Sequence, residues 1–220
     1  MKKILYNKYD KNRIPALPRV LFPGRIIVVV NAEQARSAVR YLLDQPLLGM
    51  DTETRPSFTK GVSYHVSLLQ VSTPEVCFLF RLNLIGESPD IIRLLEDRKV
   101  LKVGLSWHDD LTMLHRLYSF TPGNFVEIQD LVKTVGIEDM SLQKIYANVF
   151  GGRICKKEQL SNWERDILTD KQKQYASTDA WACVKLYEEL LRLKETGHYE
   201  LMIQEEPQIE DQTDDETDLS

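Results

Sequence analysis

An apolar run that ends in two closely spaced acids is the feature that most constrains this chain. Residues 47–54 read LLGMDTET, with Asp51 and Glu53 two positions apart. If the run is a strand, its side chains alternate between the two faces, so both carboxylates project from the same face. Two like charges side by side repel each other, and they are tolerated either in water or with a cation between them. A hard divalent cation with oxygen ligands suits such a pair, so further carboxylates brought to this place would indicate a metal site.

The composition indicates one domain with a complete hydrophobic core. The chain has 220 residues, of which 43% are hydrophobic, and this is enough to form such a core. With a net charge of -5, the chain lacks the excess of basic residues that is typical of many nucleic-acid-binding proteins. This counts only weakly against nucleic-acid binding, because a local basic patch and bound cations offset an acidic average.

Neither the cysteines nor the apolar segments indicate secretion or a membrane span. Cys77, Cys155 and Cys183 lie far apart, without metal-ligand spacing or the even number of a disulfide framework. The N-terminus lacks the apolar core of a signal peptide, and no run approaches the roughly 20 apolar residues of a transmembrane helix. We therefore expect a soluble, intracellular protein of the cytoplasm with no membrane partner.

Three segments divide the chain. Residues 1–24 are polar, basic and rich in proline, so we expect an N-terminal arm that either wraps the domain or stays loose. Residues 25–200 form the predicted domain. Residues 201–220 form an acidic tail, in which positions 205–218 hold eight acids and no aromatic residue. This composition is typical of disorder.

Hydrophobic periodicity and capping residues predict an α/β domain. The β-prone runs are residues 25–30, 47–54, 66–72, 75–80, 99–104 and 125–128. Helices are expected after the capping residues Asn31, Ser88, Ser106, Ser141 and Thr169, and over residues 129–135. The runs at 66–72 and 75–80 are separated by a short turn, as in an antiparallel hairpin. Strands mixed with helices in this order favour a mixed sheet flanked by helices.

Two further acids lie on predicted helices. Asp110 follows Asp109 at the start of a helix, where acids are also favoured by the free backbone N–H groups, so simple helix stabilisation is an alternative. Tyr175 and Asp179 are four residues apart and share one helical face, which also carries apolar residues. An unpaired charge beside such a stripe is costly, so Asp179 either has a cation as partner or lies at the edge of a solvated face.

Together these residues suggest a metal-dependent hydrolytic site. Four carboxylates at one point are tolerable only with cations. Two divalent ions about 3.5–4 Å apart form a clamp that promotes phosphodiester hydrolysis. In such a site Tyr175 is expected to hold the attacking water by a hydrogen bond.

The chain resembles the DEDD superfamily of 3′-5′ exonucleases, in the branch with a tyrosine in its third motif (DEDDy), which includes the Werner-syndrome exonuclease domain and ribonuclease D. The first motif corresponds to residues 49–54, and the second to residues 102–104 with Asp110 seven positions beyond Val103. Alignment on residues 102–104 favours Asp110 over Asp109. The third motif corresponds to residues 175–180, preceded by residues 160–163. Each motif alone is weak evidence for the family, whereas the three motifs in this order are specific for it. The resemblance covers roughly residues 25–196.

The resemblance implies a ribonuclease H-like fold, with a mixed sheet of about five strands and helices on both sides. It implies that Asp51, Glu53 and Asp179 bind a first Mg²⁺ or Mn²⁺ ion and that Asp51 bridges to a second ion near Asp110. The expected reaction is the release of nucleoside monophosphates from the 3′ end of DNA or RNA. Thr54 corresponds to a family position near that 3′ end.

Other residues near these motifs allow two interpretations. Trp107 is expected either to stack on a base of the substrate or to pack in the core. His108 is expected either to contact substrate or to lie at the surface as a capping residue. Lys156, Lys157 and Arg165 form a basic stretch that suits backbone phosphates or a solvated face equally well.

Two alternative functions remain at the level of sequence. A non-catalytic nucleic-acid-binding scaffold of the same fold predicts the loss of at least one metal ligand, whereas every expected ligand is present. A Mg²⁺-dependent phosphatase of the haloacid-dehalogenase type is suggested by the superficially similar Asp-x-Asp-x-Thr motif. In this chain, however, the second acid is Glu53, and the motif follows a strand–helix unit.

Overall fold

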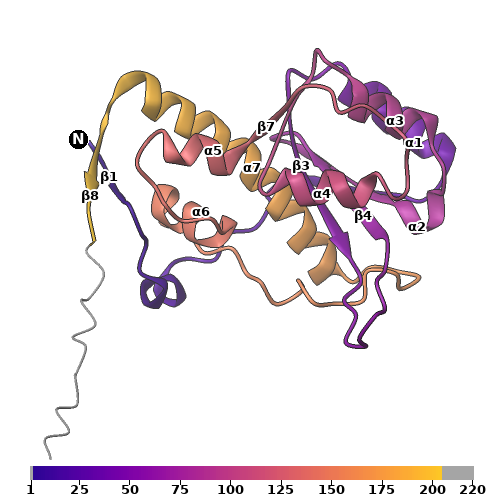
Figure 1. The fold of residues 1–220 in the computed structure, drawn as a ribbon, viewed down its shortest axis with the longest axis horizontal. Helices are drawn as coiled ribbons and strands as arrows, with labels where there is room; N and C mark the ends of the chain where they lie inside the picture. The colour runs from indigo at the N-terminus through magenta and orange to yellow at the C-terminus, as the bar shows by residue number, and fades with distance from the viewer. Residues whose placement is uncertain (1, 205–220) are drawn as a thin grey trace, which may run out of the picture.

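The computed structural model describes residues 2–204 and contains a central sheet of six strands (Figure 1). The strands are β2 (Arg25–Val29), β3 (Leu47–Thr54), β4 (Val66–Ser72), β5 (Val76–Arg81), β6 (Leu101–Gly104) and β7 (Phe125–Glu127). Their spatial order is β2-β5-β4-β3-β6-β7, and β4 runs antiparallel to both of its neighbours while the remaining pairs are parallel. The predicted mixed sheet is confirmed, with six strands where about five were expected.

Helices cover both faces of the sheet. They are the 3₁₀ helix η1 (Lys11–Ala16) and the α-helices α1 (Ala32–Leu42), α2 (Leu82–Ile85), α3 (Pro89–Glu96), α4 (Trp107–Leu114), α5 (Ile128–Lys133), α6 (Leu142–Phe150) and α7 (Asp170–Thr196). Several begin where local sequence predicts. The Asn31 side chain accepts from the Gln34 N–H, and Thr169 forms a reciprocal capping box with Gln172, which satisfies backbone donors that a helix leaves free.

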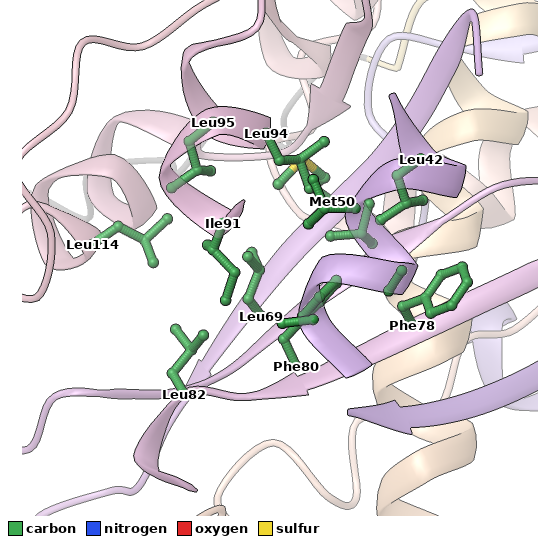
Figure 2. Packing of buried hydrophobic residues seen from close by; sticks show 14 of the residues in the cluster. Leu42, Met50, Leu69, Phe78, Phe80, Leu82, Ile91, Leu94, Leu95 and Leu114 are labelled. Atoms are coloured by element: carbon green, nitrogen blue, oxygen red, sulfur yellow. The ribbon is translucent and has the colours of Figure 1, made fainter. Parts of the chain in front are cut away.

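The first face packs against α1, α2, α3 and α4. Figure 2 shows this core, in which Met50 and Leu69 of the central strands meet Leu42 of α1 and Ile91 of α3. Every residue of β4 is buried, because Leu69 points into this core while its neighbour Leu68 packs on the opposite face. The sheet is therefore covered on both sides at its centre.

The long helix α7 crosses the second face and lies directly against β3. A methyl group placed at Gly49 of β3 would come within 1.9 Å of the Ala180 carbonyl oxygen. Only a residue without a side chain therefore permits this approach of helix to strand. Trp163, fully buried beside Ala176, packs the loop before α7 against the helix.

The N-terminal arm packs along the domain and does not stay loose. Its strand β1 (Lys3–Tyr6) pairs in parallel with β8 (Tyr199–Met202) at the end of the molecule opposite α1 and α3 (Figure 1). Leu5 is fully buried against α5, α6 and α7, and Phe22 is buried beside the middle of α7. The range assigned to the acidic tail begins inside β8, and its acidic part, residues 205–220, lies outside the described residues. Within the described residues, no helix is long and apolar enough to span a membrane.

Candidate active site

The end of β3 presents the two acids of the first motif to the face covered by α7. Pairing of β3 with β6 stops at Gly49 and Val103, so Asp51 and Glu53 extend beyond the end of β6. Alternation along the strand places both side chains on the same face as Gly49. Oxygens of Asp51, Glu53 and Asp179 lie within 4.8 Å of one another. The predicted convergence of these three carboxylates is confirmed.

Helix α7 delivers Asp179 because it packs so closely on Gly49. Asp179 immediately precedes Ala180, the residue whose carbonyl oxygen meets Gly49. Glu53 and Asp179 are only 8% and 6% exposed, and Tyr175 lies one helical turn before Asp179. Among the described residues, Asp179 Oδ1 is a buried oxygen without a hydrogen-bond partner. An all-oxygen set with an unsatisfied buried carboxylate fits a hard divalent cation.

Helix α4 delivers the fourth acid from the other side of β3. The Thr52 hydroxyl, which alternation places on the opposite face from Asp51, donates a hydrogen bond to the Asp110 carboxylate. Asp109 is exposed to solvent. Asp110 therefore occupies the position beside the cluster that alignment on residues 102–104 favours, although it stands outside the group of three closest carboxylates.

The start of α4 differs from the prediction. Ser106 does precede the helix, but it adopts a left-handed conformation with φ of 64° and its side chain makes no capping bond. The Glu127 carboxylate caps the helix instead, accepting from the Ser106 N–H at 3.0 Å and from the Trp107 N–H at 2.8 Å. Glu127 ends β7, so its approach to α4 depends on the pairing of β6 with β7. A local motif therefore did not reveal it.

The cluster is electrostatically unfavourable without a cation. Burial raises the pKa of Asp51 and Glu53 well above their usual values, and the neighbouring carboxylates raise them further. Burial raises the pKa of Asp179 to about 7, although Tyr175 and Lys156 partly offset this. Burial likewise raises the pKa of Asp110 to about 6, against the opposing hydrogen bond from Thr52. Repulsion of this kind is relieved when a multivalent cation binds.

A cavity of about 280 Å³ opens onto the cluster. Its lining includes Asp51, Glu53 and Asp179 together with Tyr175 and Lys156. The cavity lining thus combines three carboxylates with one lysine and one phenol.

The three residues predicted as substrate contacts lie outside the lining of the acidic cavity. Trp107 is only 4% exposed and packs edge-on against Phe125, with ring centroids 5.0 Å apart. The suggestion that it stacks on a base is therefore wrong, and the core interpretation holds. His108 is exposed on the first turn of α4, and Thr54 is partly buried at an irregularity that ends β3. Neither residue lines the cavity, and substrate contact by either stays a prediction.

Two residues of the site were not chosen from sequence. Glu127 was missed because capping across elements leaves no local pattern. The sequence presents Lys156 only as part of a basic stretch, yet it lines the acidic cavity and acts electrostatically on Asp179. Its place beside the acids depends on how the loop before α7 folds, and the spacing of residues in the sequence does not reveal it.

Comparison with known proteins agrees with this geometry. A family model described as 3′-5′ exonuclease matches residues 26–194. The chain is 30% identical over 191 residues to the mouse bifunctional 3′-5′ exonuclease/ATP-dependent helicase WRN, covering 82% of this chain and 14% of that protein. It is 31% identical over 192 residues to the Drosophila melanogaster exonuclease 3′-5′ domain-containing protein 2, covering 81% of this chain and 32% of that protein. The chain thus spans less than a third of the length of either relative.

Solved structures share the fold at lower sequence identity. The EXO domain of Nibbler from Aedes aegypti superposes with a TM-score of 0.71 at 19% identity, covering 80% of this chain and 91% of that one. RNase D from Escherichia coli superposes with a TM-score of 0.70 at 19% identity, covering 78% and 45%. The fold and the match over residues 26–194 together show that the chain belongs to the 3′-5′ exonuclease family.

Proposed function

We propose that this chain is a metal-dependent 3′-5′ exonuclease that hydrolyses the terminal phosphodiester bond of a nucleic-acid strand and releases a nucleoside monophosphate. The observation that carries the proposal is the acidic cavity in which Asp51, Glu53 and Asp179 meet within 4.8 Å. Membership of the family supports the reaction class. The buried, mutually repelling carboxylates support the requirement for a divalent cation.

Each acid has a distinct proposed part in binding cations. Asp51, Glu53 and Asp179 are proposed to hold one Mg²⁺ or Mn²⁺ ion, and Asp110 to hold a second together with Asp51. When bound, such a pair of ions supplies an activated water and neutralises the charge that develops on the leaving oxygen. The hydrogen bond that the Thr52 hydroxyl donates to the Asp110 carboxylate is proposed to fix the position of this carboxylate.

Tyr175 is proposed to orient the water and the scissile phosphate. Burial raises the pKa of its hydroxyl above the usual value, and the neighbouring acids raise it further. The hydroxyl therefore stays protonated at neutral pH and acts as a hydrogen-bond donor, not as a base. Lys156, which lines the same cavity, is proposed to contact a phosphate oxygen of the terminal nucleotide.

The proposed substrate is the 3′ end of DNA or RNA. A Trypanosoma brucei RNase D of the same fold, with a TM-score of 0.67 at 20% identity, has been solved in complex with RNA U12. This supports nucleic acid as the substrate class. Thr54 and His108 are proposed as contacts to the terminal nucleotide, from the end of β3 and the start of α4.

The test is hydrolysis of 5′-labelled single-stranded DNA and RNA with Mg²⁺ or Mn²⁺. We expect shortening from the 3′ end one nucleotide at a time, with release of mononucleotides, and no reaction in EDTA. Asp51→Asn should abolish the reaction, because it removes the carboxylate shared by both proposed ions.

Two results would overturn the proposal. One is the absence of mononucleotide release from every substrate by folded protein, and binding without turnover would then favour the scaffold alternative. The other is full activity of Asp51→Asn. Hydrolysis of a small phosphate ester through a trapped aspartyl-phosphate would instead favour the phosphatase alternative.

A further inference from the structure

A second and larger cavity adjoins the acidic one. Its volume is about 530 Å³, and it lies between the N-terminal arm, the loop after α6 and the first turns of α7. Tyr175, Lys156, Gln143 and Ile154 line both cavities. The two cavities therefore lie side by side, and we call the larger one the arm channel.

The arm channel is lined by cations from three separate parts of the chain. They are Lys11 and Arg19 of the arm, Arg153, Lys156 and Lys157 of the loop after α6, and Lys171 of α7, with Glu158 as the only acid among the lining residues. Within residues 2–204, none of these six cations forms an ion pair. A concentration of unpaired positive charge is unusual in a chain whose net charge is -5, and it indicates an anionic ligand.

The arm is fixed in place as one wall of this channel. The Val20 N–H donates to the Arg153 carbonyl at 3.0 Å, and the Arg153 N–H donates to the Pro18 carbonyl at 2.9 Å. Farther along, the Phe22 N–H donates to the Thr178 hydroxyl at 3.0 Å. The Arg153 guanidinium also donates to the Pro15 carbonyl at 3.0 Å. The channel is thus built from backbone pairing and does not depend on the ligand to assemble it.

We propose that the arm channel binds the phosphodiester backbone of a single strand whose 3′ end lies in the acidic cavity. The inference rests on the proposed function, because it takes the acidic cavity as the place of the 3′ end. Two observations carry it: the positive charge of the channel lining, and the four lining residues that the two cavities share. Lysine and arginine contacts of this kind position a strand by its phosphates and do not read its bases. The arm precedes residue 26, where the match to the family begins, so this wall lies outside the segment that defines the family.

The first test measures binding in EDTA, where no turnover occurs. Lys11→Gln combined with Arg19→Gln removes two exposed cations of the channel wall. The affinity for a fluorescein-labelled 12-nucleotide strand should fall on the order of tenfold at 0.1 M salt. The slope of log K against log salt should become shallower by about 1.4, since each phosphate contact on a single strand contributes about 0.7.

The matched control is Arg98→Gln combined with Lys99→Gln. Both side chains are exposed and follow α3, away from the two cavities. This variant has the same change in net charge, so it should keep the wild-type salt slope and affinity. Equal slopes for the channel variant and the control would overturn the proposal, and thermal unfolding of each variant verifies that both are folded.

The second test compares the lengths of the substrate during turnover. The ratio of kcat/KM for a 12-nucleotide strand to that for a dinucleotide should fall on the order of tenfold in the channel variant, because only the longer strand reaches the arm. An unchanged ratio would count against the channel.

The two proposals fail in different ways. In one outcome the wild-type protein binds the 12-nucleotide strand, the channel variant has the expected shallower salt slope, and the wild type releases no mononucleotide. This outcome would refute the exonuclease and leave the channel as a binding surface. Wild-type turnover with identical slopes and ratios in the channel and control variants would refute the channel alone.

Discussion

At the scale of single residues, the acidic cluster and the glycine beneath it account for most of the site. The sequence predicts Asp51 and Glu53 from strand alternation, Asp179 from its helical face and Asp110 from alignment on residues 102–104. Their part in metal binding stays a prediction. Gly49 was present in the same motif, but its importance lies in a contact with Ala180 of α7. A contact between residues so distant in the chain leaves no spacing from which to predict it, so the reason that Asp179 reaches Asp51 became visible only in the fold.

Replacing Asp179 by asparagine should stabilise the metal-free protein while it abolishes activity. Because folding raises the pKa of Asp179 to about 7, its protonated form is favoured in the folded state. The stability of metal-free protein is therefore highest below the ordinary pKa of about 4 and declines as the pH rises through 7. At pH 8 in EDTA, Asp179→Asn should gain on the order of 2 kcal/mol and lose at least about a hundredfold in turnover.

Urea unfolding at pH 5 and pH 8, each with and without Mn²⁺, measures this effect. Mn²⁺ should stabilise the wild-type protein more at pH 8 than at pH 5, and it should stabilise the variant little at either pH. A variant that is less stable than the wild type in EDTA at pH 8 would contradict the prediction.

Replacing Gly49 by alanine should disturb both stability and metal binding. The added methyl group would meet a backbone carbonyl at 1.9 Å, so α7 has to move away from β3. We expect a loss of about 1–3 kcal/mol, the usual cost of overpacking, and a weaker affinity for Mn²⁺ in calorimetric titration because Asp179 moves with the helix. An unchanged melting temperature together with unchanged Mn²⁺ affinity would show that the contact of Gly49 with Ala180 determines neither the stability nor the metal site.

At the scale of elements, helix starts were predicted best where the cap is local. Asn31 and Thr169 cap their own helices and could be identified from a few residues of sequence. Helix α4 is different, because its cap comes from Glu127, about twenty residues later in the chain, and Ser106 takes a left-handed conformation to join β6 to the helix. The start of α4 matters because this helix carries Asp110.

Removing the Glu127 cap should loosen the start of α4. Glu127→Ala leaves the Ser106 and Trp107 N–H groups without their acceptor, which should cost about 1–2 kcal/mol. Asp110 then loses its fixed position, so kcat should fall more than KM rises. Glu127→Gln keeps one acceptor oxygen in the same place and should recover part of both losses, whereas equal defects in the two variants would exclude a positioning role.

At the scale of the whole molecule, sequence predicted the sheet and its flanking helices but not the way the ends of the domain are joined. Pairing of β1 with β8 connects residues almost two hundred positions apart. Nothing in the sequence of either strand predicts which strand it pairs with. The Glu189 carboxylate strengthens this end of the molecule. It accepts from the Arg192 guanidinium at 2.8 and 2.9 Å and forms an ion pair with Lys3 of the arm.

Acid should weaken this attachment in a defined pH window. Hydrogen bonds from Arg192 and Lys3 lower the pKa of Glu189 to about 2. Its stabilising contribution is therefore complete above the ordinary value of about 4.5 and is lost as the pH falls toward 2. Glu189→Gln should cost about 1 kcal/mol at pH 7, since the pair is partly screened by solvent, and almost nothing near pH 2.

Thermal unfolding at the two pH values tests this prediction. Glu195→Gln, an exposed acid on the same helix without an ion pair to a described residue, is the matched control and should have little effect at either pH. A cost for Glu189→Gln that persists unchanged at pH 2 would contradict the assigned cause.

The pairing of β1 with β8 makes the two extremities of the described chain depend on each other. The arm that forms one wall of the channel is anchored by Lys3–Tyr6, and those residues are held in register by Tyr199–Met202. Loss of β8 would therefore remove one support of Lys3–Tyr6, while hydrogen bonds to Asn148 and Arg153 would still hold the arm. A change at the C-terminal side of the domain would in this way reach the first residues of the arm, although the two lie almost two hundred positions apart in sequence.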